Sequence, residues 1–392
     1  MRTVRLSANA NAEPFSNEAF ASKSDDLSRN VYCVLGIPID AVDMPGLLRA
    51  VHDSARDRTP FLISTPNLHF LVNSQKDPEF RESLLLSDLC PADGMPIVWI
   101  ARLIGLPIKE RIAGSNMLEA LKAENHSKQR LKIFLFGGAD GIVEIAAKKL
   151  NQSGTGLLCV ASINPGFGTM EEMSKDYIID RINASGADFL IAALSAKKGQ
   201  LWLQHNHDRL QIPVRAHLGA AINFAAGKFR RAPSAVQKLG LEWLWRIKEE
   251  PYLWKRYWDD GSVLLRLLLT HVFPLAIRAR WQRMGESKHL DIKYAQHEDT
   301  ITLSLAGAAI ADNVETAIGL FREALAKKRE IRIDLSDTRI IDSRFFGAFL
   351  MLRKSTRRRG TDLKFIGVSP QLQKQFRLHG TGFLLVQHQS AY

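Results

Sequence analysis

The sequence predicts an α/β protein with two separately folded α/β domains and a basic, aromatic helical appendage between them. Over residues 31–228, short β-rich runs alternate with amphipathic helical stretches, and a similar alternation restarts over residues 285–392. The intervening residues 229–284 hold five of the seven tryptophans, set among many lysines and arginines. A chain of 392 residues exceeds the usual size of a single domain, so more than one hydrophobic core is expected.

Composition and charge narrow the class of protein and of partner. Apolar residues make up 46% and charged residues 24%, as in an ordinary soluble globular protein. The formal net charge of +12 indicates an anionic partner, such as phosphates, lipid headgroups or nucleic acid. The three cysteines form no Cys-x-x-Cys pair, which argues against a disulfide framework or a zinc site and favours a reducing cytoplasm. Residues 1–30 lack periodicity and a secretory apolar stretch, which predicts a disordered leader.

Buried strands alternate with helices in the first domain, at residues 31–228. The runs FLISTPN, LKIFLFGG and ADFLIAAL are typical of such strands, and amphipathic stretches such as DGIVEIAAKKL separate them. This alternation implies a parallel sheet that binds ligands at the carboxyl ends of its strands. Polar or small residues follow three of the strands: Thr65 and Asn67, Gly137 and Gly138, and Lys198 and Gln200.

The pair Gly137–Gly138 has two interpretations. Glycines before a helix let backbone N–H groups approach a phosphate. They also form tight strand-to-helix turns. The pair is not part of a G-x-G-x-x-G motif, and no acidic residue stands about twenty positions further on, which weakens the case for a nicotinamide dehydrogenase.

The appendage at residues 229–284 is strongly basic. From Lys228 to Lys288 there are 13 Lys and Arg against 6 Asp and Glu. The aromatic residues recur at spacings near three and four, which on a helix gives an aromatic face bordered by cations, typical of a helix lying on anionic lipid. The alternative is a stripe packed on the first domain. No zinc-finger, RRM or KH signature accompanies the charge, so nucleic acid is not expected. The apolar run at 263–277 is too short to span a bilayer.

Residue Asp93 stands out in the stretch CPADGMPIVW, at residues 90–99. A strand that ends in Asp-Gly usually ends in a turn, so Asp93 is either a loop carboxylate facing water or a reactive carboxylate at the lip of a cleft. The pattern alone leaves both open.

Two families resemble parts of the chain. Residues 31–260 resemble the WecG/TagA/CpsF family of bacterial glycosyltransferases in four stretches: STPN, DPEFRESLLLSDLCPADGMPIVWIARLIGLPIKERIAGSNML, IFLFGG and GAAINFAAGKFRRAPSAVQKLGLEWLWRIKEEP. Residues 289–392 resemble a STAS domain, through IDLSDTRIIDSRFFGAFLML and LKFIGVSPQL. The resemblance implies a Rossmann-like glycosyltransferase domain over 31–228, the appendage over 229–284 and a STAS-like domain over 285–392.

The family resemblance also implies an activity. It is the inverting transfer of a hexosyl or N-acetylhexosaminyl group from a UDP-sugar to a polyprenyl-diphosphate-linked acceptor, during synthesis of an exopolysaccharide or other cell-surface polysaccharide. The enzyme would be peripheral on the inner face of the cytoplasmic membrane and would need no metal and no cofactor. Two features of the sequence agree: it has no Asp-x-Asp motif for a metal-bound nucleotide-sugar, and its basic aromatic appendage suits a lipid-linked acceptor.

Roles for individual residues follow from the matched positions. Asp93 matches the family's general base, which takes a proton from the acceptor hydroxyl. Thr65 and Asn67 match positions near the sugar, where they would orient hydroxyl groups; the alternative is turn formation around Pro66.

Arginines are expected to neutralise the leaving diphosphate. Arg111 matches a family active-site arginine, and Arg246 and Arg256 lie where the family supplies arginines that close over the site. Any one of these could instead be a solvated or lipid-facing charge, and Arg230 and Arg231 could meet lipid phosphate. Trp254, Lys255 and Trp258 are the residues predicted to contact the membrane.

One loop departs from the family pattern. Where relatives carry Pro-Lys-Gln-Glu, this chain has SAKKGQ, with Lys197 in place of the proline and Gly199 in place of the glutamine. Lys198 is retained, and Gln200 is a candidate substitute from one position further on. The identity of the donor is therefore open. The same departure supports an alternative, a non-catalytic nucleotide-sugar-binding regulator that acts through the STAS-like domain.

In the STAS-like domain, Ser343 follows Asp342, where some relatives carry a phosphorylatable serine. A short side chain at this position can also simply cap a helix. Arg344 and Phe345 replace smaller residues and would crowd the turn. We therefore predict a module that binds a protein partner and is not phosphorylated.

Overall fold

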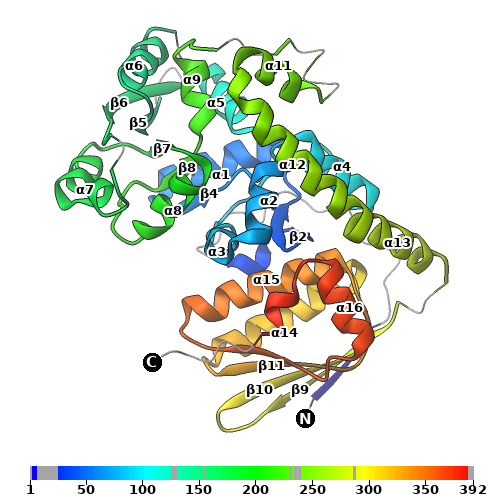
Figure 1. The fold of residues 1–392 in the computed structure, drawn as a ribbon. Helices are drawn as coiled ribbons and strands as arrows, with labels where there is room; N and C mark the ends of the chain where they lie inside the picture. The colour runs from blue at the N-terminus through cyan, green and yellow to red at the C-terminus, as the bar shows by residue number, and fades with distance from the viewer. Residues whose placement is uncertain are drawn as a thin grey trace. The chain divides into compact units, whose positions relative to one another are not determined.

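The computed structural model describes residues 2–6, 25–124, 130–153, 156–166, 168–229, 232–233, 236, 240–285 and 288–386. The chain forms two compact units. The central unit consists of residues 42–98 and 109–264, and the terminal unit consists of residues 1–41, 99–108 and 265–392. Each unit has its own sheet and its own core (Figure 1).

A five-stranded parallel sheet forms the centre of the central unit. Its strand order is β4 (Phe61–Ile63), β8 (Val214–His217), β7 (Phe189–Ala193), β5 (Leu131–Gly137) and β6 (Leu157–Ile163). The three inner strands β8, β7 and β5 are almost wholly buried, as expected for parallel strands covered by helices on both faces. The prediction of a parallel α/β sheet is confirmed.

Helices cover both faces of this sheet. Helices α7 (Asp176–Asn183) and α8 (Ala196–His205) lie on one face, and α6 (Ile142–Ser153) and α9 (Gly219–Ala225) lie on the other (Figure 1). Phe134 and Phe136 of β5 point toward α8, where the ring of Trp202 stacks on Phe136 with centroids 4.0 Å apart. Alternate residues of the strand therefore fill the two opposite layers of the core.

The remaining helices of the central unit connect the strands and carry the site. They are α1 (Met44–Asp57), α2 (Leu68–Lys76), α3 (Pro78–Leu85), α5 (Gly114–Ala123) and α11 (Glu242–Glu249). Side-chain caps set several helix starts: Asp43, Asn67 and Asp77 each accept a backbone hydrogen bond in the first turn of α1, α2 and α3. Helix α4 (Met95–Leu103) begins in the central unit, and its residues from Trp99 onward belong to the terminal unit.

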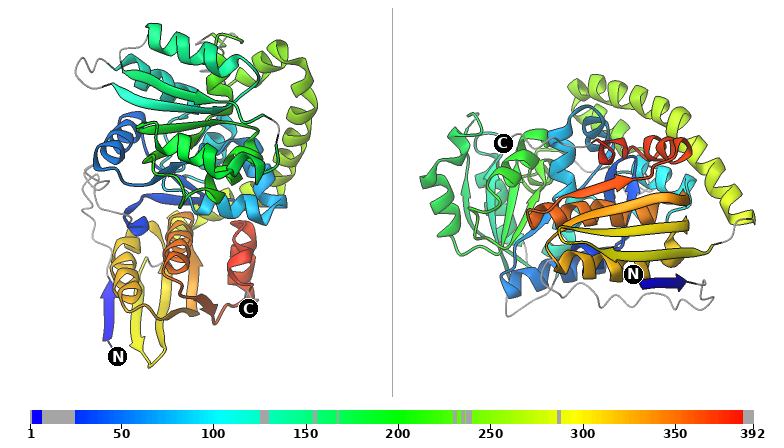
Figure 2. Two further views of the ribbon diagram at one scale, coloured as in Figure 1. Left: turned by 90° about the vertical axis from the view of Figure 1, so that its left-hand side faces the viewer. Right: turned by 90° about the horizontal axis from the view of Figure 1, so that it is seen from below.

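The terminal unit holds a second, mixed sheet. Its order is β1 (Arg2–Leu6), β9 (Leu290–Gln296), β10 (Thr300–Ala309), β11 (Glu330–Ile341) and β12 (Leu363–Ile366), antiparallel at β1–β9 and β9–β10 and parallel beyond. Helices α14 (Val314–Ala326) and α15 (Ser343–Arg358) cover one face of this sheet (Figures 1 and 2), and α16 (Pro370–Leu378) follows β12. The prediction of a small C-terminal α/β domain is confirmed.

The unit boundaries differ from the predicted domain boundaries. The hairpin of β2 (Val31–Val34) and β3 (Ile37–Asp40) was expected in the first domain but packs on α15, so closely that a Cβ on Gly347 would lie 2.1 Å from the carbonyl oxygen of Val31. Residues 99–108 and 265–284 also belong to the terminal unit. Local periodicity identifies these elements, whereas the layer on which each one packs depends on distant residues.

The predicted disordered leader is wrong at both ends. Residues 2–6 form β1, and the carboxylate of Asp26, which is buried, forms ion pairs with Lys354 and Arg358 of α15 at 2.6 and 3.0 Å. These long-range partners, more than 300 residues away, fix a segment whose own sequence has no periodicity. The rest of the predicted leader, residues 7–24, lies outside the described residues.

The basic aromatic segment is largely helical. It continues from α11 through η3 (Pro251–Leu253), α12 (Trp254–Leu267), the π-helical turn η4 (Leu268–Val272) and α13 (Phe273–Gly285). The helix from Pro251 to Arg280 has 30 residues, and by length and composition alone it is long and apolar enough to cross a membrane. The prediction of a run too short to span is therefore wrong for the helix as a whole. Pro274 does not end the helix because it follows the π-helical turn, where helices accommodate the missing N–H.

Candidate active site

Backbone hydrogen bonds join three loops around Asp93. The N–H of Asp93 donates to the carbonyl oxygen of Pro66 at 2.8 Å, and the N–H of Ile112 donates to the carbonyl oxygen of Ala92 at 2.8 Å. The loop after β4, the loop before α4 and the loop before α5 therefore meet beyond the carboxyl end of β4, where a parallel sheet places its ligands.

The carboxyl group of Asp93 has a raised pKa. Burial disfavours the charged form and raises the pKa to about 7, although the side chain keeps partial access to solvent. The charges of Arg111 and Arg246 and the N–H of Gly114 act in the opposite direction, and the charge of Glu242 adds to the rise. A carboxyl group that titrates near neutral pH can take up a proton during a reaction and release it afterwards. Asp93 is thus not an ordinary loop carboxylate in water.

The arginines near Asp93 are paired with glutamates. Arg111 Nη1 contacts Glu242 Oε2, and Arg246 Nη2 contacts Glu250 Oε2. Glu250 also accepts a hydrogen bond from the hydroxyl of Tyr252 at 2.5 Å. Burial acts to raise the pKa of Glu250, but the hydrogen bonds from Tyr252 and Arg246 prevail, so the pKa is lowered and the carboxylate stays charged.

Thr65 and Asn67 lie on the loop tied to Asp93. Thr65 is buried, and its hydroxyl has no hydrogen-bond partner among the described residues. Asn67 caps α2 by accepting from the N–H of Phe70 at 3.1 Å, so its side-chain oxygen has a structural role, and its role near the sugar stays a prediction. Its Cβ lies 3.5 Å from where a Cβ on Gly94 would be, and Gly94 has a φ of +102°, which favours glycine.

Gln200 bonds to Ser64, the residue before Thr65. The residue is fully buried, and its side-chain nitrogen donates to Ser64 Oγ at 2.6 Å and lies 3.3 Å from Ser87 Oγ. The amide therefore holds Ser64, just beyond the carboxyl end of β4, and has no exposed surface, which favours a structural role; its substitution for the family glutamine stays a prediction. Lys198 Nζ is bound to the carbonyl oxygen of Gly168.

The glycine pair forms a turn. The N–H of Gly138 donates to the carbonyl oxygen of Ala193 at 2.8 Å, so it is already used within the fold. Gly137 and Gly138 have φ values of +89° and +97°, and a Cβ on Gly137 would lie 2.8 Å from Leu194 Cδ2. The tight-turn interpretation is the one that the geometry supports.

Arg256 lies near the same glutamate network. Its charge acts on Glu250 and Tyr252, its guanidinium lies 5.1 Å from the ring centroid of Tyr257, and its buried Nε has no hydrogen-bond partner among the described residues. Arg230 and Arg231 lie outside the described residues. A further pair, His69 Nδ1 and Asp260 Oδ2 at 3.0 Å, connects α2 to α12.

Sequence reasoning missed Glu242, Glu250, Tyr252 and the pair His69–Asp260. The ion pair Arg246–Glu250 has the i, i+4 spacing of a helix and was detectable in the run EWLWRIKEEP. Nothing local indicates Arg111–Glu242 or His69–Asp260, since their partners are 131 and 191 residues apart.

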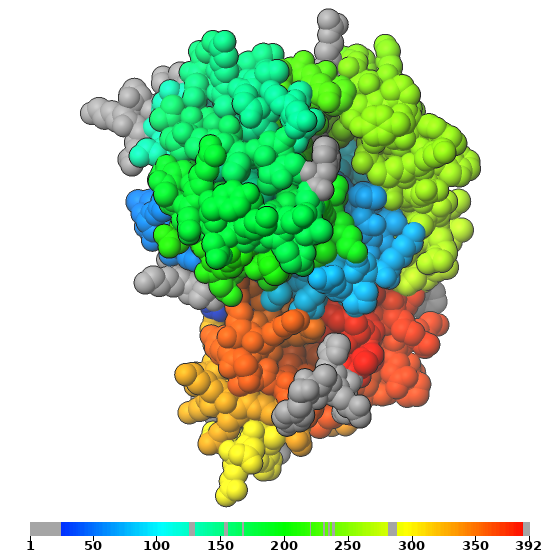
Figure 3. Space-filling model, turned by 60° about the vertical axis from the view of Figure 1, so that its left-hand side comes forward, coloured from blue at the N-terminus to red at the C-terminus, as the bar shows by residue number. Residues whose placement is uncertain are grey.

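The residues predicted to contact a membrane are exposed. Trp254 is 54% and Trp258 73% exposed, and Lys255 Nζ lies 5.9 Å from the ring centroid of Trp254. Further along the helix, Leu265, Leu269, Phe273 and Ile277 are also exposed. This part of the chain, yellow-green in Figure 3, lies at the molecular surface. The alternative of a fully packed aromatic stripe does not hold for these two tryptophans.

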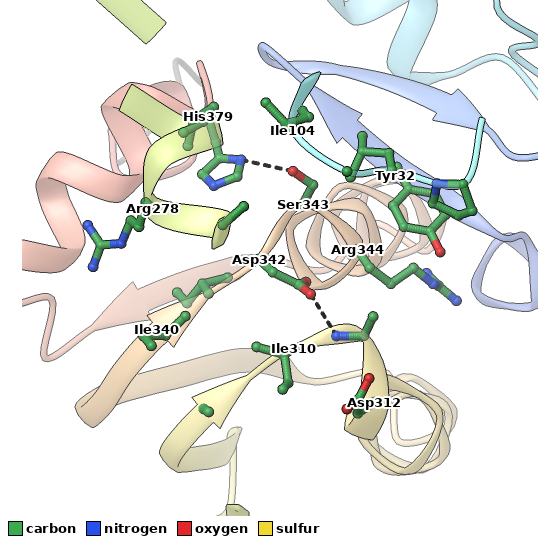
Figure 4. Close-up of a pocket in the computed structure, with 18 of the residues that line it drawn as sticks. Tyr32, Ile104, Arg278, Ile310, Asp312, Ile340, Asp342, Ser343, Arg344 and His379 are labelled. Atoms are coloured by element: carbon green, nitrogen blue, oxygen red, sulfur yellow. Dashed lines mark hydrogen bonds between the residues drawn. The ribbon is translucent and has the colours of Figure 1, made fainter. Parts of the chain in front are cut away.

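The terminal unit contains a cavity of about 450 Å³ at the start of α15 (Figure 4). Ser343 and His379 line it, with Ser343 Oγ 3.4 Å from His379 Nδ1, and burial lowers the pKa of His379 to about 3. Asp342 accepts from the N–H groups of Phe345 and Ala311. Ser343 is only 6% exposed, and Arg344, also buried, pairs with Glu315 at 3.1 Å. This crowding supports the prediction that Ser343 is not phosphorylated, which stays a prediction.

One comparison concerns the C-terminal part of the chain. Residues 292–386 match the family model "Mlab, STAS domain". A solved STAS domain of an antisigma-factor antagonist from Rhodobacter sphaeroides is 21% identical and covers 21% of this chain and 92% of that chain, with a TM-score of 0.18.

Two relatives carry the name N-acetylglucosaminyldiphosphoundecaprenol N-acetyl-beta-D-mannosaminyltransferase. The protein from Bacillus spizizenii is 24% identical over 50% of this chain and 73% of its own length, and the one from Bacillus subtilis is 24% identical over 53% and 78%. Residues 32–276, which hold Asp93, Arg111 and Arg246, match the model of the "Glycosyl transferase WecG/TagA/CpsF family". Because that match covers more than half of the chain, the protein belongs to the WecG/TagA/CpsF family of glycosyl transferases.

Proposed function

We propose that this protein transfers a sugar, with inversion, from a UDP-sugar to an acceptor sugar linked to polyprenyl diphosphate. The observation that carries the proposal is the carboxyl group of Asp93, whose pKa is near 7 and whose electrostatic surroundings include Arg111 and Arg246. The relatives' name supports the acceptor class and makes an N-acetylhexosamine the first donor sugar to test.

The proposed reaction is a single displacement. The acceptor hydroxyl attacks the anomeric carbon from the face opposite the nucleotide, and Asp93 takes its proton as the new bond forms. The bond from the anomeric carbon to the diphosphate oxygen breaks, and UDP leaves with the electron pair. The configuration at the anomeric carbon is inverted. The proton then passes from Asp93 to solvent, which a pKa near 7 permits.

Arginines supply the positive charge that the leaving group needs. Arg111 and Arg246 act on Asp93, and Arg256 belongs to the adjoining glutamate network. A guanidinium pairs with phosphate oxygens through two N–H groups and stabilises charge that develops on the diphosphate. We assign this role to the arginines, and we expect transfer to need no divalent cation. The hydroxyl of Thr65 and the side chain of Asn67 are assigned to the hydroxyl groups of the sugar.

The helix at 251–280 is proposed to lie on the membrane surface rather than across it. One face of the helix is buried, at Leu253, Asp260, Leu267, Val272 and Leu275. The other face exposes aromatic and aliphatic side chains, at Trp254, Trp258, Leu265, Leu269, Phe273 and Ile277. One packed face and one exposed apolar face are expected of an interfacial helix, with Lys255 and Arg266 available to anionic headgroups. This would place the enzyme on the inner face of the cytoplasmic membrane, during synthesis of a cell-surface polysaccharide.

A donor panel tests the proposal. The full chain is incubated with N-acetylglucosaminyl-diphosphoundecaprenol and, in turn, with UDP-N-acetylmannosamine and other radiolabelled UDP-sugars, with and without EDTA. Transfer of label to lipid from one donor, unchanged by EDTA, is the expected result. If no donor gives transfer but a UDP-sugar binds, the protein is instead the nucleotide-sugar-binding regulator that the altered loop at 195–200 favours.

A further inference from the structure

Glutamates hold both arginines that act on Asp93. Glu242, the first residue of α11, contacts Arg111, and Glu250, the residue that follows α11, contacts Arg246. Arg111 and Arg246, two of the three arginines assigned to the diphosphate, therefore each already pair with a carboxylate in the free protein. A diphosphate that binds either of these two arginines has to compete with its carboxylate.

The two carboxylates differ in how firmly they are held. The Glu250 side chain is 6% exposed and takes a second hydrogen bond, from the hydroxyl of Tyr252. The Glu242 side chain is 18% exposed, and Arg111 is its one ion-pair partner among the described residues. If Glu250 left Arg246, it would be a buried carboxylate without its ion-pair partner, which is costly. Glu242 is more exposed and can turn toward water. Glu242 is therefore the exchangeable partner.

A carboxylate and a phosphate compete for the same face of a guanidinium. Both present two oxygens to the fork of N–H groups, so an arginine that pairs with one can pair with the other in the same geometry. The Arg111 side chain is only 13% exposed, which leaves little room for a second anion beside Glu242. Binding of diphosphate at Arg111 then requires Glu242 to leave.

We propose that Glu242 is an internal counter-ion that holds Arg111 in the free protein and gives way to the diphosphate of the nucleotide. This inference rests on the proposed function, since it assumes that Arg111 meets the diphosphate of UDP. One anion replaces another and no covalent bond changes. The competition lowers the affinity for UDP, and return of Glu242 to Arg111 favours release of UDP after transfer. Glu242 acts through Arg111 and is a positioning residue.

The test is a binding measurement with the full chain. UDP and, separately, inorganic pyrophosphate are titrated by calorimetry at one low ionic strength. We expect Glu242→Gln to bind both about five- to tenfold more tightly, since removing the competitor of a partly exposed arginine frees roughly that much affinity. Glu242→Asp, which keeps the charge on a shorter side chain, should give a smaller gain. Asp259→Asn, the same charge change at an exposed position of α12, is the matched control and should stay within about twofold.

A double-mutant cycle identifies the route of the effect. In an Arg111→Gln background, Glu242→Gln should give no gain in affinity, because the guanidinium for which Glu242 and the diphosphate compete is absent. If the gain in affinity persists in that background, or if Asp259→Asn reproduces it, the tighter binding comes from the change in net charge, and the inference is overturned. Unchanged or weaker binding by Glu242→Gln would overturn it as well. If the wild type binds pyrophosphate but not UDP, the proposed UDP donor fails, while the pyrophosphate titrations still decide the role of Glu242.

Discussion

The backbone N–H of Asp93 donates to the carbonyl oxygen of Pro66 at 2.8 Å, which ties the proposed base to the loop of Thr65 and Asn67. A second backbone bond, from the N–H of Ser64 to the carbonyl oxygen of Leu89 at 2.9 Å, holds the same two loops together. Neither bond uses a side chain. Side-chain substitutions at Asp93 and Thr65 should therefore change chemistry while leaving the loops in place, whereas Asn67 also caps α2 through its side chain.

The first prediction concerns Asp93→Asn. The amide cannot take the proton of the acceptor hydroxyl, so kcat should fall by about 10²-fold or more, the usual scale for loss of a general base. The affinity for UDP, measured by calorimetry, should change little. Activity within about threefold of the wild type would show that Asp93 is only a turn residue.

Thermal unfolding of the same variant provides its folding control. The pKa of Asp93 is about 7 in the folded protein, well above the ordinary value of 3.8 for an aspartate, so the folded state favours the protonated form. The wild type therefore loses stability as the pH rises from about 4 to about 7. Asp93→Asn carries no such charge. Its melting temperature should exceed that of the wild type at pH 8, and the difference should shrink toward pH 5.

The second prediction is the pH dependence of transfer. A base must be deprotonated to act, and burial raises the pKa of Asp93 to about 7. The acidic limb of kcat/KM should therefore fall below a midpoint near pH 7, rather than near pH 4 as for an exposed aspartate. A rate that is constant from pH 5 to pH 8 would rule out Asp93 as the base whose ionisation controls transfer.

The third prediction concerns membrane binding by the helix at 251–280. Lys255→Glu should weaken binding to anionic vesicles by about tenfold at low salt. The substitution changes the charge by two units, and each unit near the surface contributes about 1 kcal/mol or less to membrane binding. The effect should fade as salt is raised. Trp254→Ala should weaken binding at low and high salt alike, since its contribution is apolar.

Vesicle flotation measures these changes, with Lys374→Glu as the matched control. Lys374 is exposed on α16, so its reversal changes the net charge equally without touching the helix. Lys374→Glu should bind like the wild type. Flotation that is the same for all three variants would remove the membrane assignment of the helix.

The fourth prediction separates a structural role from a binding role at Gln200. Gln200→Met removes the buried hydrogen bond to Ser64, so the free energy of unfolding should fall by about 1–3 kcal/mol. The affinity for UDP should stay the same. Gln211→Met, at an exposed position of the central unit, should change neither quantity. Weaker UDP binding by Gln200→Met without a loss of stability would contradict the structural role.

The two sheets could be predicted because their signals are local. A strand such as LKIFLFGG is buried on both faces and is followed by an amphipathic helix, and a few such units specify a parallel sheet. Local signals could not predict that the loop of Thr65 and Asn67 lies beside Asp93, because this depends on the parallel bridge between Ile63 and Leu89. The family resemblance supplied that part, and side-chain periodicity alone did not.

The sequence by itself determined the alternation of strands and helices, the polar residues after β4 and the charged aromatic helix, because each depends on neighbours within a few turns of chain. Tertiary structure decided that Gln200 is buried, that Asp26 is held by α15 and that Glu242 meets Arg111. Each of these depends on a partner more than 100 residues away. The burial of a polar side chain is set by the layer that packs over it, and periodicity along the chain carries no information about that layer.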